Sequence, residues 1–419
     1  MGVRAKRFGL RHLAALALWL ACALVPALAA ARGDGIKAGP GRLHLGIDLD
    51  LVYETNANYA PSGSPSQAGD LILRMRPGLT LDFPSDVVSL LLNGKVGYDY
   101  YFGIEKAATT DLSSVVGLAD LTVGFNPNGV FAVFLEDQLS RTGDPRYTSL
   151  SGKFDRTDNE TKLRFQLRPT GGALQFDLAY GFFLDWFDDF GGMSSYAHRC
   201  YFSGKWRFFP KTALVLDFDA DLRRYPSGYE GGAHNPDING IRATVGMLGQ
   251  ITPSLSVVAK VGYGDTLLEG GTSMDGTPYA GDDFRSAIAQ AELSLRFATT
   301  FVQLGYQRNF QPVINFGWFG TDKLYLRFQQ QLLGKINLGA DFAFDMLSYG
   351  RPINQTAAGR DDYLLFGGAS VDYMILDWLA VGLAYHFQVL LTEWVDPLGA
   401  GGNLDYNKHA CILRIVLDY

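Results

Sequence analysis

The residues of this chain that could do chemistry are carboxylates and cations at every second position. The densest run is Asp217-x-Asp219-x-Asp221. Because calcium and similar cations prefer carboxylate oxygens, a metal site is one interpretation of this run. On a β-strand, however, neighbouring side chains of the run would lie about 6–7 Å apart, too far for one ion without ligands from other strands. The spacing favours a row of charges on a solvated wall, and we expect neither a metal nor a cofactor.

Catalytic motifs are missing from the sequence. It contains no G-x-S-x-G nucleophile turn and no H-E-x-x-H zinc motif. Beyond the N-terminal segment the cysteines are Cys200 and Cys411, which lie far apart and match no metal spacing. The sequence therefore indicates a protein that is not an enzyme, although a site assembled across several strands would leave no linear motif.

A larger set of charged residues shares the alternating pattern. If the apolar residues of each strand face lipid, residues of the opposite phase face an interior lumen, where they could exchange hydrogen bonds with a polar solute. The candidate lumen and transport residues are Arg74, Arg76, Arg164, Arg168, Lys205, Arg207, Asp217, Asp219, Asp221, Arg327, Asp341, Asp345 and Arg414. A solvated wall of paired charges without a specific ligand is the alternative interpretation of each.

The element that positions these residues is a long amphipathic β-hairpin. Residues 69–83 carry apolar side chains at every second position, and residues 90–102 repeat the pattern after a turn at Pro84-Ser85. Because the side chains of a strand alternate between two faces, this period predicts one apolar and one polar face. Both strands exceed the five or six residues usual in soluble sheets and suit strands that cross a membrane.

The same pattern recurs along the chain and predicts 18 strands. We expect them at residues 41–55, 69–83, 90–102, 112–126, 130–141, 158–168, 173–188, 196–209, 212–224, 239–251, 255–266, 284–298, 301–310, 321–332, 335–347, 362–375, 378–394 and 404–419. Their connections alternate between tight turns, such as Phe209-Pro210-Lys211, and long polar loops, such as residues 142–157. This asymmetry is typical of an outer-membrane barrel with both termini in the periplasm.

We therefore predict an all-β fold, a transmembrane up-and-down antiparallel β-barrel of about 18 strands in the lipid of the bacterial outer membrane. Charged residues are 19% and aromatic residues 13% of the 419 residues. A helical membrane protein would be more apolar, whereas apolar residues spread in alternation give this intermediate composition. A propeller or solenoid is disfavoured because no motif recurs beyond the hairpin itself.

The N-terminus is organised differently. Four basic residues at positions 4–11 precede an apolar run at residues 13–31 that ends in small side chains. This layout predicts a secretory signal peptide at residues 1–31 and the barrel at residues 32–419, with a retained anchor helix as the alternative. Removing four of the 36 basic residues leaves 32 against 43 acidic ones. That acidic balance argues against nucleic acid as a partner.

Three short segments resemble a known family. Tyr53-Glu54-Thr55-Asn56, Asp70-Leu71-Ile72 and Arg76-Pro77-Gly78-Leu79-Thr80-Leu81 are similar to segments of the β-barrel porins encoded with exopolysaccharide synthesis genes. The resemblance implies an outer-membrane protein that assists polysaccharide secretion, with a periplasmic export partner supplying the energy. It brings no catalytic residues.

The sequence leaves more than one function open. The resemblance favours a conduit for exopolysaccharide export across the outer membrane. The barrel alone equally fits a general or selective diffusion porin, whose lumen charges and an infolded loop would select small solutes. A structural barrel without transport activity is a third interpretation.

Overall fold

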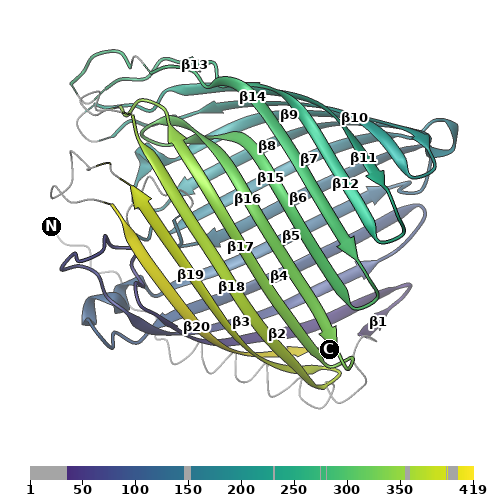
Figure 1. Ribbon diagram of the computed structural model, residues 1–419, viewed down its shortest axis with the longest axis horizontal. Coiled ribbons are helices and arrows are strands. Elements are labelled where there is room, and N and C mark those ends of the chain that lie inside the picture. Colours follow the sequence, from purple (N-terminus) through teal and green to yellow (C-terminus); the bar gives the residue numbers. More distant parts are fainter. Residues whose placement is uncertain are drawn as a thin grey trace.

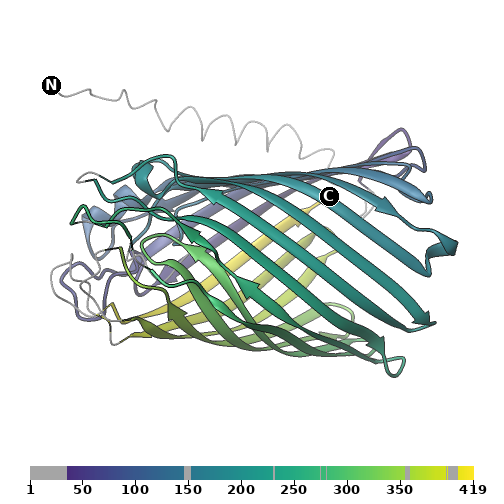
Figure 2. The same ribbon diagram turned by 90° about the horizontal axis from the view of Figure 1, so that it is seen from above.

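Alternating apolar and polar residues form strands along nearly all of the described chain, as a computed structural model shows (Figure 1). The structure describes residues 35–145, 152–229, 232–273, 275–279, 281–353, 359–392, 394 and 404–419. The predicted signal peptide at residues 1–31 lies outside these residues. The strands are tilted against the long axis of the barrel (Figure 2), as closure of a sheet requires.

Eighteen strands of 11–16 residues span the described part of the barrel. They are β2 (Gly41–Glu54), β3 (Asp70–Phe83), β4 (Val88–Tyr101), β5 (Ser114–Phe125), β6 (Phe131–Thr142), β7 (Arg156–Leu167), β8 (Leu174–Phe187), β9 (Ser195–Phe209), β10 (Thr212–Arg224), β11 (Asp237–Gln250), β12 (Leu255–Asp265), β14 (Arg285–Arg296), β15 (Thr300–Val313), β16 (Gly317–Leu332), β17 (Ile336–Tyr349), β18 (Asp361–Leu376), β19 (Leu379–Thr392) and β20 (Tyr406–Asp418).

The remaining elements are short. They are strands β1 (Ile36–Ala38) and β13 (Leu268–Glu269), and the 3₁₀ helices η1 (Ala107–Leu112), η2 (Thr170–Gly172) and η3 (Gly191–Met193). No helix in the described ranges is both long and apolar enough to cross a membrane.

Antiparallel pairing closes the sheet into a ring. Each spanning strand pairs with its neighbours along the chain, and β2 pairs with β20 from Gly46↔Asp418 to Glu54↔Ala410. The C-terminus is fixed at this seam, because Leu45 and Tyr419 exchange two backbone hydrogen bonds of 3.1 and 2.9 Å. The fold is therefore the predicted closed antiparallel barrel of 18 spanning strands.

The two ends of the barrel differ, as predicted. Short turns such as that between β9 and β10 lie at the end that holds the C-terminus, and the longer loops lie at the opposite end (Figure 1). We call the latter the loop end.

One connection at the loop end is much shorter than predicted. The sequence pattern predicted strands ending at residue 310 and starting at residue 321, whereas β15 continues to Val313 and β16 starts at Gly317. The extension occurs because Val313, Phe316 and Phe319 pack into a buried apolar cluster. Positive φ angles of 69° at Asn315 and 73° at Gly317 allow the chain to reverse within three residues.

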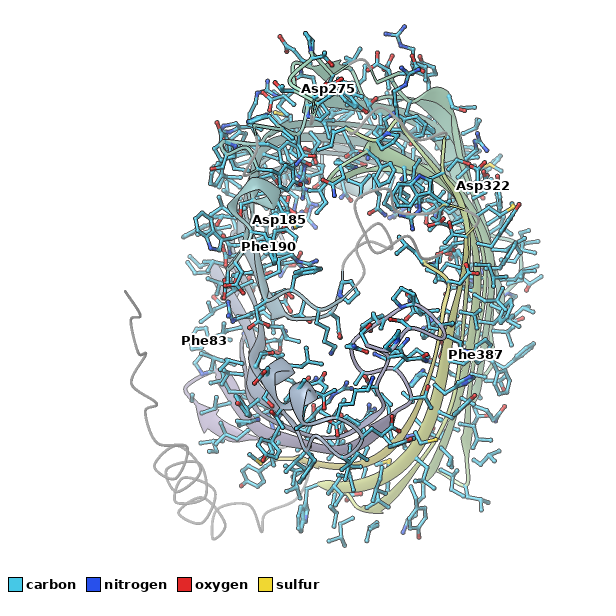
Figure 3. All side chains as sticks on the ribbon, turned by 90° about the vertical axis from the view of Figure 1, so that its left-hand side faces the viewer. Phe83, Asp185, Phe190, Asp275, Asp322 and Phe387 are labelled. Atoms are coloured by element: carbon cyan, nitrogen blue, oxygen red, sulfur yellow. The ribbon has the colours of Figure 1, made fainter. Side chains whose placement is uncertain are left out.

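The outer surface of the barrel is apolar. Leu178, Val245 and Leu383 are more than half exposed, while Asp185 and Asp221, which have the opposite phase on their strands, are buried. Figure 3 shows Asp185 on the inner side of the wall. Exposed aliphatic rows of this extent would aggregate in water, but they match a hydrocarbon environment. Together with the even strand count, they define a transmembrane barrel of the outer-membrane type.

Candidate functional site

The lumen wall contains a polar cavity of about 490 Å³, formed by strands β7 to β15. Most of its charged side chains come from the lumen-facing phase of these strands, because their sequence neighbours project into lipid. Four cations and three carboxylates of this phase line it: Lys162, Arg164, Arg242, Lys260, Asp177, Asp217 and Asp219; Arg308, of the opposite phase, is a further lining residue. Hydroxyl and amide groups of Tyr201, Ser203, Gln290, Gln307 and Asn309 complete the wall. The cavity can therefore donate hydrogen bonds to a solute and accept them from it.

Most charges of this cavity neutralise one another. Lys260 lies 2.7 Å from Asp217, which also accepts a 2.6 Å hydrogen bond from the Ser203 hydroxyl. Arg164 lies 3.2 Å from Asp177. Because the charges are already paired across neighbouring strands, a passing solute would exchange weak hydrogen bonds with the wall and would meet no strong fixed charge.

A second polar cluster lies at the loop end, on the inner face of β2, β3, β4 and β20. Glu54, 3% exposed, lies 2.8 Å from both Arg74 and Lys408. Arg74 and Arg76 both contact Asp99, at 3.4 and 3.3 Å. Ion pairs with so little solvent depend on each partner for compensation of charge, so removal of one member of this cluster would leave a poorly compensated charge. We call these five residues the Glu54 cluster.

In the loop between β6 and β7, residues 143–155, the structure describes 143–145 and 152–155, and Lys153 of this loop interacts electrostatically with Glu54. Lys153 of this loop lies 2.9 Å from Asp144 and donates a hydrogen bond to the hydroxyl of Tyr101 on β4. Its ammonium also lies 5.8 Å from the ring centroid of Tyr59, and the Lys408 ammonium lies 3.8 Å from the same centroid. Since Tyr101 faces the lumen, the contact places Lys153 on the inner side of the wall.

The ion pair between Lys153 and Asp144 is expected to persist from about pH 4 to about pH 10. Burial favours the neutral forms, but the charges of Lys153 and Lys408 outweigh it and lower the pKa of Asp144. Burial likewise lowers the pKa of Lys153, yet the negative charge of Asp144 outweighs it and raises that pKa. The stabilisation is therefore lost only as pH falls through the lowered carboxyl pKa, or rises through the raised ammonium pKa.

Single-channel recordings across this pH range would test the expectation. The frequency of loop-dependent closures should stay constant from pH 4.5 to pH 9.5, a range inside the limits given by the ordinary pKa values of about 4 and about 10. A sharp change of that frequency near pH 7 would contradict the assignment of the loop contact to this ion pair.

The candidate residues found from the sequence separate into several places on the inner wall. Arg164, Asp217 and Asp219 meet in the cavity, while Arg74 and Arg76 join the Glu54 cluster. The others make separate contacts: Asp221 with Arg199 at 3.0 Å, Arg414 with Asp50 at 3.0 Å, Asp345 with Lys323 at 3.3 Å, Arg327 with Gln303 at 3.3 Å, and Arg168 with the carbonyl of Pro127. Lys205, Arg207 and Asp341 form no ion pair within the described ranges.

The run Asp217-x-Asp219-x-Asp221 has an electrostatic explanation. Asp217 contacts Lys260 and Asp221 contacts Arg199, so two of the three carboxylates already face a cation from another strand. Asp219 is paired in register with Arg242 on β11. Two of the three carboxylates thus bind different cations, and the third has a cation as its cross-strand neighbour, so the three are not gathered around one point.

Sequence reasoning missed two cations of the cavity and the loop contact. Lys162 and Arg242 share the phase of lumen residues on β7 and β11, so periodicity alone could have identified them. Lys153 could not be found in this way, because a loop residue has no phase and its partner Tyr101 lies 52 residues away.

The fold and its polar interior define the class of protein, a transmembrane β-barrel with a solvated, charge-paired lumen. No family model matches the sequence, and no curated protein sequence matches it. The resemblance to porins encoded with exopolysaccharide genes is thus unsupported by any match.

Solved structures with a similar architecture include the outer membrane protein OpdK of Pseudomonas aeruginosa. OpdK of Pseudomonas aeruginosa with vanillate is 9% identical with a TM-score of 0.49, and the match covers 90% of this chain and 99% of that one. OccAB3 of Acinetobacter baumannii is 10% identical with a TM-score of 0.47, over 91% and 100% of the two chains. OpdQ of Pseudomonas aeruginosa is 11% identical with a TM-score of 0.48, over 91% and 100%. Similarity at this level says nothing about a solute.

Proposed function

We propose that the protein is a diffusion porin of the bacterial outer membrane for small polar solutes. One observation carries this proposal: Lys153 bonds to Asp144 of its own loop and to the lumen-facing Tyr101, so the described loop residues around Lys153 lie against the inner wall and narrow the lumen. A loop fixed in this way suits solutes small enough to pass beside it. The charge-paired cavity of about 490 Å³ would offer such solutes weak, exchangeable hydrogen bonds.

The same proposal includes an orientation. The short turns and the C-terminus lie at one end of the barrel (Figure 1), and bacterial barrels have short turns on the periplasmic side. Both ends of the barrel domain would then lie in the periplasm, after removal of a signal peptide at residues 1–31. The long loops, including residues 143–155, would face the outside.

Export of exopolysaccharide is the weaker candidate. It depends on the resemblance of a few residues around Arg76-Pro77-Gly78 and requires a periplasmic partner protein to supply energy. A polymer strand would also have to displace the loop that Lys153 holds, which costs several interactions at once. No described contact favours a polymer over a small solute.

Reconstitution of the purified barrel into planar bilayers would test the proposal. We expect steady ion conductance without any partner protein, because charged, hydroxyl and amide side chains line the cavity on the inner wall. Proteoliposomes should also swell in the presence of small neutral sugars, and swelling should slow as the sugar grows from mono- to trisaccharide. Absence of conductance combined with a loss of secreted polysaccharide in a gene deletion would contradict the porin and favour export.

A further inference from the structure

The outer face of the barrel has an apolar groove of about 640 Å³ where the sheet closes, across β18, β19, β20, β2 and β3. Five side chains form the cross-strand row nearer the loop end, which the strand pairing gives as Ala369, Tyr385, Cys411, Tyr53 and Leu71. The small side chains of Ala369 and Cys411 sit beside the large ring of Tyr385, and this difference in size makes the depression. These side chains share the phase of the exposed aliphatic residues, so the groove opens to lipid.

The next cross-strand row, toward the short-turn end, is entirely aliphatic. Val371, Leu383, Leu413 and Leu51 follow one another through the same register, two residues nearer the short-turn end of the barrel. At its short-turn end the groove therefore has a hydrocarbon lining, because none of these four side chains can form a hydrogen bond.

The polar groups of the groove are confined to its loop end. The Tyr385 hydroxyl lies 2.7 Å from Nδ1 of His409, with the two rings stacked at 6.1 Å. His409 is level with the end of β2, because its backbone N–H and carbonyl both bond to Thr55. On the other side of Cys411, the Tyr53 hydroxyl donates a 3.1 Å hydrogen bond to Glu105. The groove is therefore amphiphilic along its length.

The Tyr385–His409 pair keeps one hydrogen-bond donor for a ligand in either tautomer. If the tyrosine hydroxyl donates to Nδ1, the imidazole retains Nε2–H; if Nδ1–H donates to the hydroxyl oxygen, the tyrosine retains its own O–H. A donor at the loop end of an apolar groove suits a molecule with an acceptor-rich head and a hydrocarbon chain.

We propose that this groove binds one acyl chain of a lipid from the leaflet on the loop side, with Tyr385 and His409 holding the oxygens of its head. Under the orientation proposed above, that leaflet is the outer one, so the occupant is its phosphorylated glycolipid, lipid A. The polarity of the groove argues for a lipid over a second copy of the chain, because a flat apolar protein contact would have no use for donors at one end only. The site is separate from the lumen and from solute passage.

A second pair on the barrel provides a matched control. On β8 and β9, Tyr180 is paired in register with Cys200, and its hydroxyl lies 2.6 Å from Nδ1 of His198, with the rings stacked at 6.0 Å. The other neighbour of Cys200 is Ala220, where Cys411 has a second tyrosine. The Tyr–His–Cys arrangement is thus the same, but its surroundings differ.

Native mass spectrometry of the full-length barrel with purified lipid A would test the proposal. We expect one tightly bound lipid per barrel. Tyr385→Phe should weaken it about fivefold, the effect of losing one hydrogen bond. Ala369→Leu should fill the groove and weaken binding by about tenfold or more. Tyr180→Phe and Ala220→Leu should leave this affinity unchanged.

Three outcomes would overturn the proposal: equal affinity in all four variants, equal affinity for phosphatidylglycerol and lipid A, or a stable dimer that Ala369→Leu abolishes. Heat-modifiable migration in gels would first establish that each variant forms a closed barrel. Conductance in bilayers should be the same for all of them, so a failure of the lipid site is distinguishable from a failure of the porin function.

Discussion

Replacing Arg360 with methionine is expected to destabilise the barrel by about 3–5 kcal/mol. Arg360 and Asp362 form a 2.7 Å ion pair in which both side chains are 0% exposed. The guanidinium also lies between the rings of Phe316, Tyr349 and Trp394, at 5.7, 4.7 and 5.1 Å from their centroids. The substitution would leave the Asp362 carboxylate buried without its compensating charge, which is the costly way to disturb a buried pair.

Urea titration of the barrel in lipid vesicles, followed by tryptophan fluorescence, would measure this effect. Lys323→Met is the matched control, because its 3.3 Å pair with Asp345 faces the lumen and the lysine is 38% exposed; it should cost about 0–1 kcal/mol. The double variant Arg360→Met/Asp362→Leu should recover much of the loss, since both charges are then gone. Equal costs for the two single variants would contradict the explanation.

Reversing the charge of Lys153 is expected to release the loop of residues 143–155 from the lumen wall. The native Lys153 ammonium pairs with Asp144 and attracts Glu54. In Lys153→Glu a carboxylate would take its place and would repel both acidic residues. The lysine side chain is 8% exposed but that of Asp144 is 52% exposed, so loss of this half-solvated pair costs about 1–2 kcal/mol. That corresponds to a shift of about 10-fold in the balance between the docked and the released loop. Larger single-channel conductance and noisier open states should follow.

Two further variants separate loop release from a simple change of lumen charge. Lys95→Glu makes the same charge change at a lumen lysine that is 47% exposed and pairs with Asp48; it should shift ion selectivity without raising the conductance. Lys153→Arg should keep the native conductance, because a guanidinium can also reach Asp144. If Lys95→Glu raises the conductance as much as Lys153→Glu does, the loop does not limit the passage.

Most of the fold could be predicted from periodicity. The expected strand at residues 212–224 coincides with β10, and most others differ by at most three residues at each end. The pattern works because lipid on one side and water on the other impose opposite preferences on alternate residues. It failed at the β15–β16 connection, where Val313 and Phe316 pack into a buried apolar cluster with residues of β16 and β17 instead of facing lipid, so the simple alternation ends before the strand does.

The site was only partly predictable. Phase identified residues such as Arg164 and Asp217 as lumen-facing, because the direction of a strand side chain is local information. Which of them meet depends on register across several strands and on barrel curvature, neither of which is encoded in a single strand. The contact of Lys153 with Tyr101 depends on the path of a loop and could not be read from any periodic signal.

The pairing of β2 with β20 has a consequence for how the barrel is made. Asp50 and Arg414 meet across this seam from positions 364 residues apart, whereas the other spanning strands pair with partners that follow closely in the chain. Hairpins can therefore form early, but closure waits until the last strand is synthesised and delivered. Until then two strand edges are unsatisfied, and in hydrocarbon each unpaired backbone group costs several kcal/mol. Cells that make this protein must protect those edges during insertion, and a chain truncated before Tyr406 should be degraded rather than inserted.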